Sequence, residues 1–158
     1  MVRLQADAEV VIASVNGEKL VTGRGGMTLQ ADAKLADVAK QSFDLLFIPG
    51  GPGVKALRED GRAAQLAKDY AQRGKPVAAI CAAPTVLADA GLLAGKRFTA
   101  HFSVHSQLPG VLAHERVVKD GNLITSRGAG TAVEFGLALV RELFGEPKAK
   151  EIADAIML

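Results

Sequence analysis

Residues 77–87 read VAAICAAPTVL, and this stretch decides the fold because in it an apolar run meets a row of small residues. Residues 76–80 form a short apolar run, which is typical of a strand buried on both faces. Residues 82–93 predict a helix, whose first turn tolerates Pro84 because an N–H group there has no partner within the helix. Cys81, the only cysteine of the chain, is therefore expected on the turn between strand and helix.

Cys81 has two alternative roles. Ala79 and Ala83 lie two residues to either side, and small residues at these places are typical of a nucleophile elbow, a strained turn that packs closely on both sides. Such a turn aims the sulfur out of the carboxyl edge of the sheet, where N–H groups at the helix start favour a thiolate and can hold an oxyanion. The alternative is a small core residue, because free cysteine is often buried. This stretch alone leaves both open.

Composition and charge narrow the class of protein. The chain has 158 residues and 49% hydrophobic content, enough for one globular domain over residues 1–158. Its net charge is only +2 and its charges are interspersed, so we expect no nucleic-acid surface and no membrane-binding patch. No apolar run approaches the roughly 20 residues of a membrane span, and no signal-peptide pattern opens the chain, which predicts a cytoplasmic protein.

Strand and helix patterns alternate along the chain, which predicts an α/β fold with a doubly wound, mostly parallel sheet. Ligands of such sheets bind at the carboxyl ends of the strands, where the Pro-Gly-Gly loop of residues 49–53 and Cys81 would face one crevice. The parallel strands are expected at residues 10–15, 43–48 and 76–80, a β excursion at 19–33, short strands at 116–118 and 123–125, and helices at 35–40, 62–72, 131–144 and 147–157.

A thiol nucleophile needs a base, and the chain has three histidines. We select His101, because it ends a strand-like run at residues 98–100 that follows the helix after Cys81. His105 and His114 are expected in surface loops. Cofactor patterns fail: residues 128–133 lack the third glycine of a dinucleotide fingerprint, and the histidines lack the spacing of zinc ligands. We therefore expect no cofactor and no metal.

Several motifs together resemble one known family. They are FDLLFIPGG (residues 43–51), PVAAICAAPTVLADAGLL (76–93), the downstream His101 and NLITSRGAGTAVEFGLALV (122–140). In this order and at this spacing they resemble the ThiJ/PfpI superfamily, specifically the branch of the parkinsonism-associated deglycase. The resemblance covers nearly the whole chain.

The resemblance implies a flavodoxin-like sandwich, a homodimer and a set of site residues. Cys81 would be the nucleophile and redox centre, and His101 its imidazole partner. The N–H groups of Gly51 and Ala82 would form the oxyanion hole. Ala82 stands where the protease-like branch has a histidine, which argues against a peptidase. Further residues implied near the substrate or the dimer interface are Gly50, Arg24 and Arg127.

The chain departs from the family pattern at its start. Family members open with a strand and a helix before the segment equivalent to residues 9–15, and that opening supplies a glutamate that hydrogen-bonds the cysteine. Only residues 2–8 would remain of that helix here. We hypothesise that the natural protein is longer, or that another segment, for example from a second chain, fills the place of the interior strand.

The resemblance also implies a reaction. The Cys81 thiolate would attack the aldehyde of methylglyoxal or a related α-oxoaldehyde, and proton transfers would yield lactate, as in a glutathione-independent glyoxalase; a similar attack would serve a deglycase. Without the family glutamate, His101 must do more of the proton transfer. The alternative is a redox sensor or stress chaperone that works through oxidation of Cys81 without turnover. A third possibility is an inert cysteine.

Overall fold

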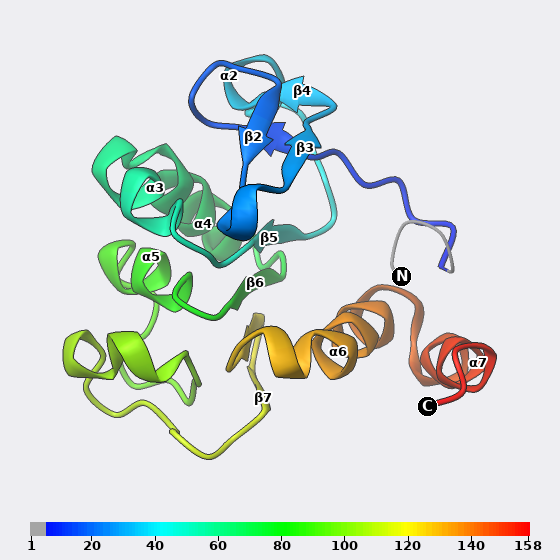
Figure 1. Cartoon of the computed structure of the whole chain (residues 1–158). Helices are drawn as coiled ribbons and strands as arrows, with labels where there is room; N and C mark the ends of the chain where they lie inside the picture. Colours follow the sequence, from blue (N-terminus) through cyan, green and yellow to red (C-terminus); the bar gives the residue numbers. More distant parts are fainter. Residues whose placement is uncertain (1–5) are drawn as a thin grey trace.

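The computed structural model describes residues 6–158. Its main sheet has four strands, of which β5, β6 and β7 are labelled in Figure 1. The strand order is β5 (Leu46–Ile48), β6 (Val77–Ile80), β8 (Leu123–Ser126) and β7 (Val117–Asp120). β5, β6 and β8 are parallel, and β7 is antiparallel to β8. The helices are α2 (Leu35–Val38), α3 (Val54–Asp60), α4 (Arg62–Gln72), α5 (Pro84–Asp89), α6 (Ala132–Phe144) and α7 (Glu146–Ala155), with short 3-10 helices η1 (Arg24–Gly26), η2 (Phe102–Gln107) and η3 (Ala129–Thr131).

The side chains of β6 alternate between two buried clusters, one on each face of the sheet. Val77 and Ala79 belong to the cluster that includes residues of α4 and α5. Ala78 and Ile80 belong to the cluster that includes Phe135 of α6. Successive side chains of a strand point to opposite faces, so a strand that is apolar throughout needs helices on both sides. The expected flavodoxin-like α/β fold with a mostly parallel sheet is confirmed.

The helices agree in part with the sequence patterns. The helix expected at residues 62–72 is observed as α4 with the same bounds. The helix after Cys81 is shorter than expected, because Gly91 takes a left-handed conformation with φ of 73° just after α5. The sequence does not predict α3, which follows the Pro-Gly-Gly loop and has no side-chain hydrogen bond at its N-cap.

Residues 98–100 form no strand, so that expectation is wrong. Phe98 and Ala100 are buried, but hydrogen bonds to side chains take the place of a strand ladder. The Thr99 N–H donates to the Thr125 hydroxyl at 3.0 Å, and the Thr99 hydroxyl donates to the Glu115 carbonyl at 3.0 Å. This segment still leads the chain from α5 back to His101, where η2 begins.

The N-terminal part of the described chain forms two small sheets beside the main one (Figure 1). The expected β excursion is confirmed as the antiparallel pair β2 (Leu20–Thr22) and β3 (Thr28–Gln30). The strand expected at residues 10–15 is observed only as β1 (Ala13–Ser14), which pairs with β4 (Ala33–Lys34). It does not join the main sheet. Instead, the Ile12 carbonyl accepts hydrogen bonds from the N–H groups of Asp32 and Ala33, and the Ile12 N–H donates to the Asp32 carboxylate.

The edge of the main sheet bears on the hypothesis of a missing strand. Within residues 6–158, β5 pairs only with β6, and Phe47 of β5 is 44% exposed although it makes an edge-on ring contact with Phe135. The hypothesis itself stays a prediction, and residues 2–5 of the expected helix remnant lie outside the described residues. No helix within residues 6–158 has the length and apolar character needed to cross a membrane.

Candidate active site

Cys81 lies on the turn between β6 and α5, as the sequence predicts. Its φ is +65°, a left-handed conformation that is rare for a residue with a side chain. The turn is held by a hydrogen bond from the Cys81 N–H to the Ser126 carbonyl at 2.9 Å. The residue is partly exposed rather than buried. Strained backbone of this kind clusters at functional sites, and the partial exposure argues against a cysteine that serves only to fill the core.

The Pro-Gly-Gly loop packs directly on Cys81. A Cβ atom added at Gly50 would lie 2.5 Å from the Cys81 Cβ, 2.8 Å from the Ile80 carbonyl oxygen and 3.3 Å from the Cys81 sulfur. No side chain fits at that distance, so glycine lets the loop reach the cysteine. Gly50 of the loop therefore packs on Cys81, and the crevice that the loop and Cys81 are expected to share stays a prediction.

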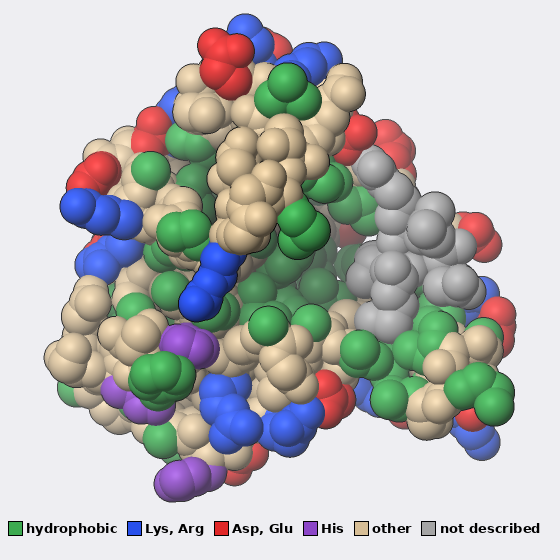
Figure 2. All heavy atoms as spheres, viewed as in Figure 1, with side chains coloured by type: hydrophobic (Ala, Val, Ile, Leu, Met, Phe, Trp, Pro, Cys, Tyr) green, Lys and Arg blue, Asp and Glu red, His purple; other side chains and the backbone are tan. Residues whose placement is uncertain are grey.

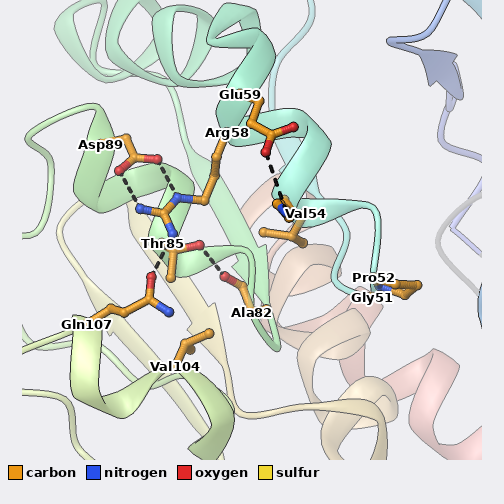
Figure 3. Close-up of a pocket in the computed structure, with 11 residues that line it drawn as sticks. Gly51, Pro52, Val54, Arg58, Glu59, Ala82, Thr85, Asp89, Val104 and Gln107 are labelled. Atoms are coloured by element: carbon orange, nitrogen blue, oxygen red, sulfur yellow. Dashed lines mark hydrogen bonds and ion pairs between the residues drawn. The ribbon is translucent and has the colours of Figure 1, made fainter.

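Two backbone N–H groups beside Cys81 are free to donate. Among residues 6–158, no carbonyl or side chain accepts from the N–H of Gly51 or of Ala82. Both residues line a cavity of about 670 Å³, whose other walls come from α3, α5 and η2 (Figure 3). Free N–H groups close to a nucleophile can stabilise a developing oxyanion.

His101 is joined to Cys81 through the backbone. Its N–H donates to the Cys81 carbonyl at 2.9 Å. Its ring Nδ1 accepts from the Ser103 N–H at 3.3 Å and lies 2.9 Å from the Ser103 hydroxyl, so in the neutral ring the proton belongs on Nε2. The ring also contacts that of Phe102. Within residues 6–158, neither a histidine nor a carboxylate hydrogen-bonds to the Cys81 sulfur.

A second cavity of about 470 Å³ adjoins His101. Arg127 lines it, together with His105, and the Arg127 side chain donates to the His114 carbonyl at 3.4 Å. On the face that Figure 2 shows, histidine side chains lie near Lys and Arg side chains. Arg24 lies exposed in η1 and lines neither cavity, so its expected place near the substrate or the interface stays a prediction.

Arg58 forms part of the wall of the first cavity (Figure 3). Its Nε and Nη2 atoms donate to the two carboxylate oxygens of Asp89 at 2.7 and 2.9 Å, and its Nη1 atom donates to the Gln107 side-chain oxygen at 2.7 Å. The hydrogen bonds to Asp89 raise the pKa of the Arg58 guanidinium above its ordinary value, so this group stays charged. No cluster of three or more His, Cys, Asp or Glu side chains that could hold a metal occurs in the described residues.

Sequence reasoning missed several residues of this site. Ser103, two residues after His101, orients the ring, and a serine that closely follows a histidine is the signal that could have found it. Gly128 lies against the same ring, since a Cβ there would be 3.4 Å from the His101 Cδ2. The sequence contains no local pattern that points to Arg58 or Gln107, because the two residues that form this contact are 49 positions apart.

The family of the chain follows from its match to known proteins. Residues 1–142 match the DJ-1/PfpI family. The chain belongs to this family. It is 40% identical to the protein dj-1beta of Drosophila melanogaster over 98% of its own length and 84% of the relative. The crystal structure of that DJ-1beta superposes with a TM-score of 0.92, covering 98% of this chain and 85% of the other.

Relatives within the DJ-1/PfpI family bear different enzyme names. One is the glutathione-independent glyoxalase DJR-1.2 of Caenorhabditis elegans, 33% identical over 96% of this chain and 91% of the relative. Another is an isonitrile hydratase of Pseudomonas putida, 35% identical over 82% of this chain and 58% of the relative. The family therefore includes enzymes, and its fold alone does not select one reaction.

Proposed function

We propose that the chain is a cysteine-dependent stress-response enzyme that acts on methylglyoxal and related α-oxoaldehydes or their adducts, as a glutathione-independent glyoxalase or deglycase. The observation that carries this proposal is the left-handed turn of Cys81 beside the free N–H groups of Gly51 and Ala82. The glyoxalase name of the Caenorhabditis elegans relative supports the choice of substrate.

The first step proposed is addition of the Cys81 thiolate to the aldehyde carbon of methylglyoxal. The carbonyl π electrons move to the aldehyde oxygen, which becomes an oxyanion that the N–H groups of Gly51 and Ala82 stabilise. Protonation of that oxygen gives a hemithioacetal. A strained turn that holds the sulfur in place lowers the cost of reaching this geometry.

The later steps are proton transfers and hydrolysis. Removal of the proton from the former aldehyde carbon gives an enediol, and protonation of the neighbouring carbon gives a lactoyl thioester on Cys81. Water then hydrolyses the thioester, which yields lactate and restores the thiol. The sum is methylglyoxal plus water to lactic acid, with no external oxidant. We assign His101 as the proton carrier. Its backbone N–H donates a hydrogen bond to the Cys81 carbonyl, and Ser103 orients its ring.

A homodimer is part of the proposal. Leu20, Met27 and Leu29 of the β2–β3 excursion are 63%, 77% and 53% exposed, and Phe102 beside His101 is 75% exposed. Leu29 pairs across the hairpin with the exposed Val21, so these two side chains share one face, whereas Leu20 points to the other face. Exposed apolar side chains that share a face can form an interaction site. Arg24 lies exposed in the same excursion, which agrees with a role at an interface. Sedimentation of the purified chain would show whether two copies associate.

Blocking the only cysteine tests the proposed function. We expect the chain to produce D-lactate from methylglyoxal, and we expect iodoacetamide to abolish this activity in parallel with alkylation of Cys81, because the chain offers no other thiol. An intact mass would give the alkylated fraction. Turnover that survives complete alkylation would contradict a Cys81 nucleophile.

The partial exposure of Cys81 favours a second candidate, a redox sensor. A thiol that peroxide can reach is oxidised to sulfenic and then sulfinic acid. A sensor would gain the mass of one or two oxygen atoms at Cys81 on treatment with peroxide, and it would produce no lactate. Lactate production by the untreated chain would instead identify an enzyme.

Replacing His101 with glutamine is expected to lower lactate formation by about 10²-fold, because a positioned proton carrier contributes at least that factor. Glutamine can still form hydrogen bonds but cannot transfer protons at neutral pH. The rate constant for lactate formation measures the effect. His114→Gln is the matched control, since His114 is exposed, lines neither cavity and forms no side-chain hydrogen bond within residues 6–158. Equal losses in the two variants would contradict the role of His101.

A further inference from the structure

Arg58 joins three elements that each follow one part of the site (Figure 3). It lies on α3, its partner Asp89 lies at the end of α5, and its partner Gln107 lies at the end of η2. The partners are 31 and 49 residues away in the sequence. One planar guanidinium therefore connects three helical segments, two of which follow the paired strands β5 and β6.

Each of the three elements begins just after a residue of the site. The loop with Gly50 and Gly51 leads into α3, Cys81 leads into α5, and His101 is the N-cap of η2. The elements are short, with 7, 6 and 6 residues. A shift of one of these elements at its Arg58 contact therefore moves its other end, where the site residue lies.

We infer that Arg58 is a positioning residue, whose guanidinium fixes the Pro-Gly-Gly loop, the Cys81 turn and the His101 segment relative to one another. Two experiments test this inference. The kinetic arm measures turnover and so rests on the proposed function, whereas the structural arm measures exchange and alkylation and rests on geometry alone. The residue does not take part in the chemistry, because Asp89 and Gln107 accept three of its N–H groups and tie it to the wall of the cavity.

The contact geometry explains why arginine serves here and lysine would not. A guanidinium can donate to both oxygens of a carboxylate and, from its remaining nitrogen, to a third acceptor, whereas an ammonium is a point charge on a flexible stem. Both side chains of the pair are about one-third exposed, 34% for Arg58 and 35% for Asp89, so water does not fully screen them. Arg141, by comparison, pairs locally with Glu146 five residues on.

The kinetic arm compares Arg58→Met, Arg58→Lys and the control Arg141→Met. For both Arg58 variants we expect kcat to fall by about 10- to 100-fold with KM changed by less than about twofold, because a small misplacement of reacting groups costs rate rather than substrate affinity. Arg141→Met, which removes an ion pair between α6 and α7, should leave both constants unchanged. A rise in KM at constant kcat would overturn the inference, since it would mean that Arg58 binds substrate.

The structural arm needs no turnover, so it separates failure of this inference from failure of the proposed function. In Arg58→Met we expect faster amide hydrogen exchange in residues 50–54 and 102–107 and a changed rate of Cys81 alkylation, with exchange in α6 and α7 as in the unaltered chain. Unchanged exchange and alkylation would overturn the inference. If Arg58→Met does not fold, Gln107→Leu takes its place, because it removes only the contact to η2 and should loosen residues 102–107 alone.

Discussion

Cys81→Ser is expected to lower lactate formation from methylglyoxal by a factor on the order of 10³ or more, as the loss of a covalent nucleophile does in other enzymes. A serine hydroxyl is smaller than the thiol and is hardly ionised near neutral pH, so it cannot supply the attacking anion. The turn should survive, since its hydrogen bond to the Ser126 carbonyl comes from the backbone N–H. The D-lactate assay and a thermal melt measure the two properties together.

The control for this variant is Cys81→Ala, which removes the side-chain nucleophile altogether. We expect both variants to melt near the unaltered chain and to resist iodoacetamide, because the chain has no second thiol. Lactate formation by Cys81→Ser at more than a small part of the original rate would show that another group attacks the aldehyde. A loss of activity together with a lost thermal transition would instead assign Cys81 to the stability of the turn.

Sequence reasoning was most successful where neighbouring residues determine the structure. The turn at Cys81 follows from an apolar run that meets Pro84 within four residues, and α4 follows from its helical spacing. The residues of a turn or helix lie close in sequence, so their pattern contains most of what sets the conformation. The place of the loop of residues 49–53 near Cys81 is instead predicted from the rule that parallel strands present their carboxyl ends at one edge of a sheet.

Contacts between distant residues could not be predicted in this way. The pairing of β1 with β4 depends on which strand is available beside it, and the pattern of residues 10–15 does not contain that information. The segment at residues 98–100 has the apolar character of a strand. However, its Thr99 forms hydrogen bonds with the Thr125 side chain and the Glu115 carbonyl, which lie elsewhere in the chain, in place of a strand ladder. The three bonds of Arg58 likewise depend on how the completed core places α3, α5 and η2.

Gly50→Ala is expected to lower the free energy of unfolding by about 1 to 3 kcal/mol and lactate formation by about 10²-fold. The added Cβ would meet the Cys81 Cβ at 2.5 Å and the Ile80 carbonyl oxygen at 2.8 Å. Neither atom belongs to the far end of a flexible side chain, so the loop itself must move away. That movement also carries off the N–H group of Gly51, which we propose stabilises the oxyanion.

Gly53→Ala is the matched control in the same loop. A Cβ at Gly53 meets no atom within 4 Å, and its φ of −65° suits any residue, so this variant should be as stable as the unaltered chain or slightly more stable. Chemical denaturation gives the stability of both variants, and the rate of Cys81 alkylation reports on the loop without any assumption about the substrate. If Gly50→Ala matched Gly53→Ala in both measurements, the loop would not pack on Cys81 as the structure places it, and the oxyanion hole proposed at Gly51 would lose its support.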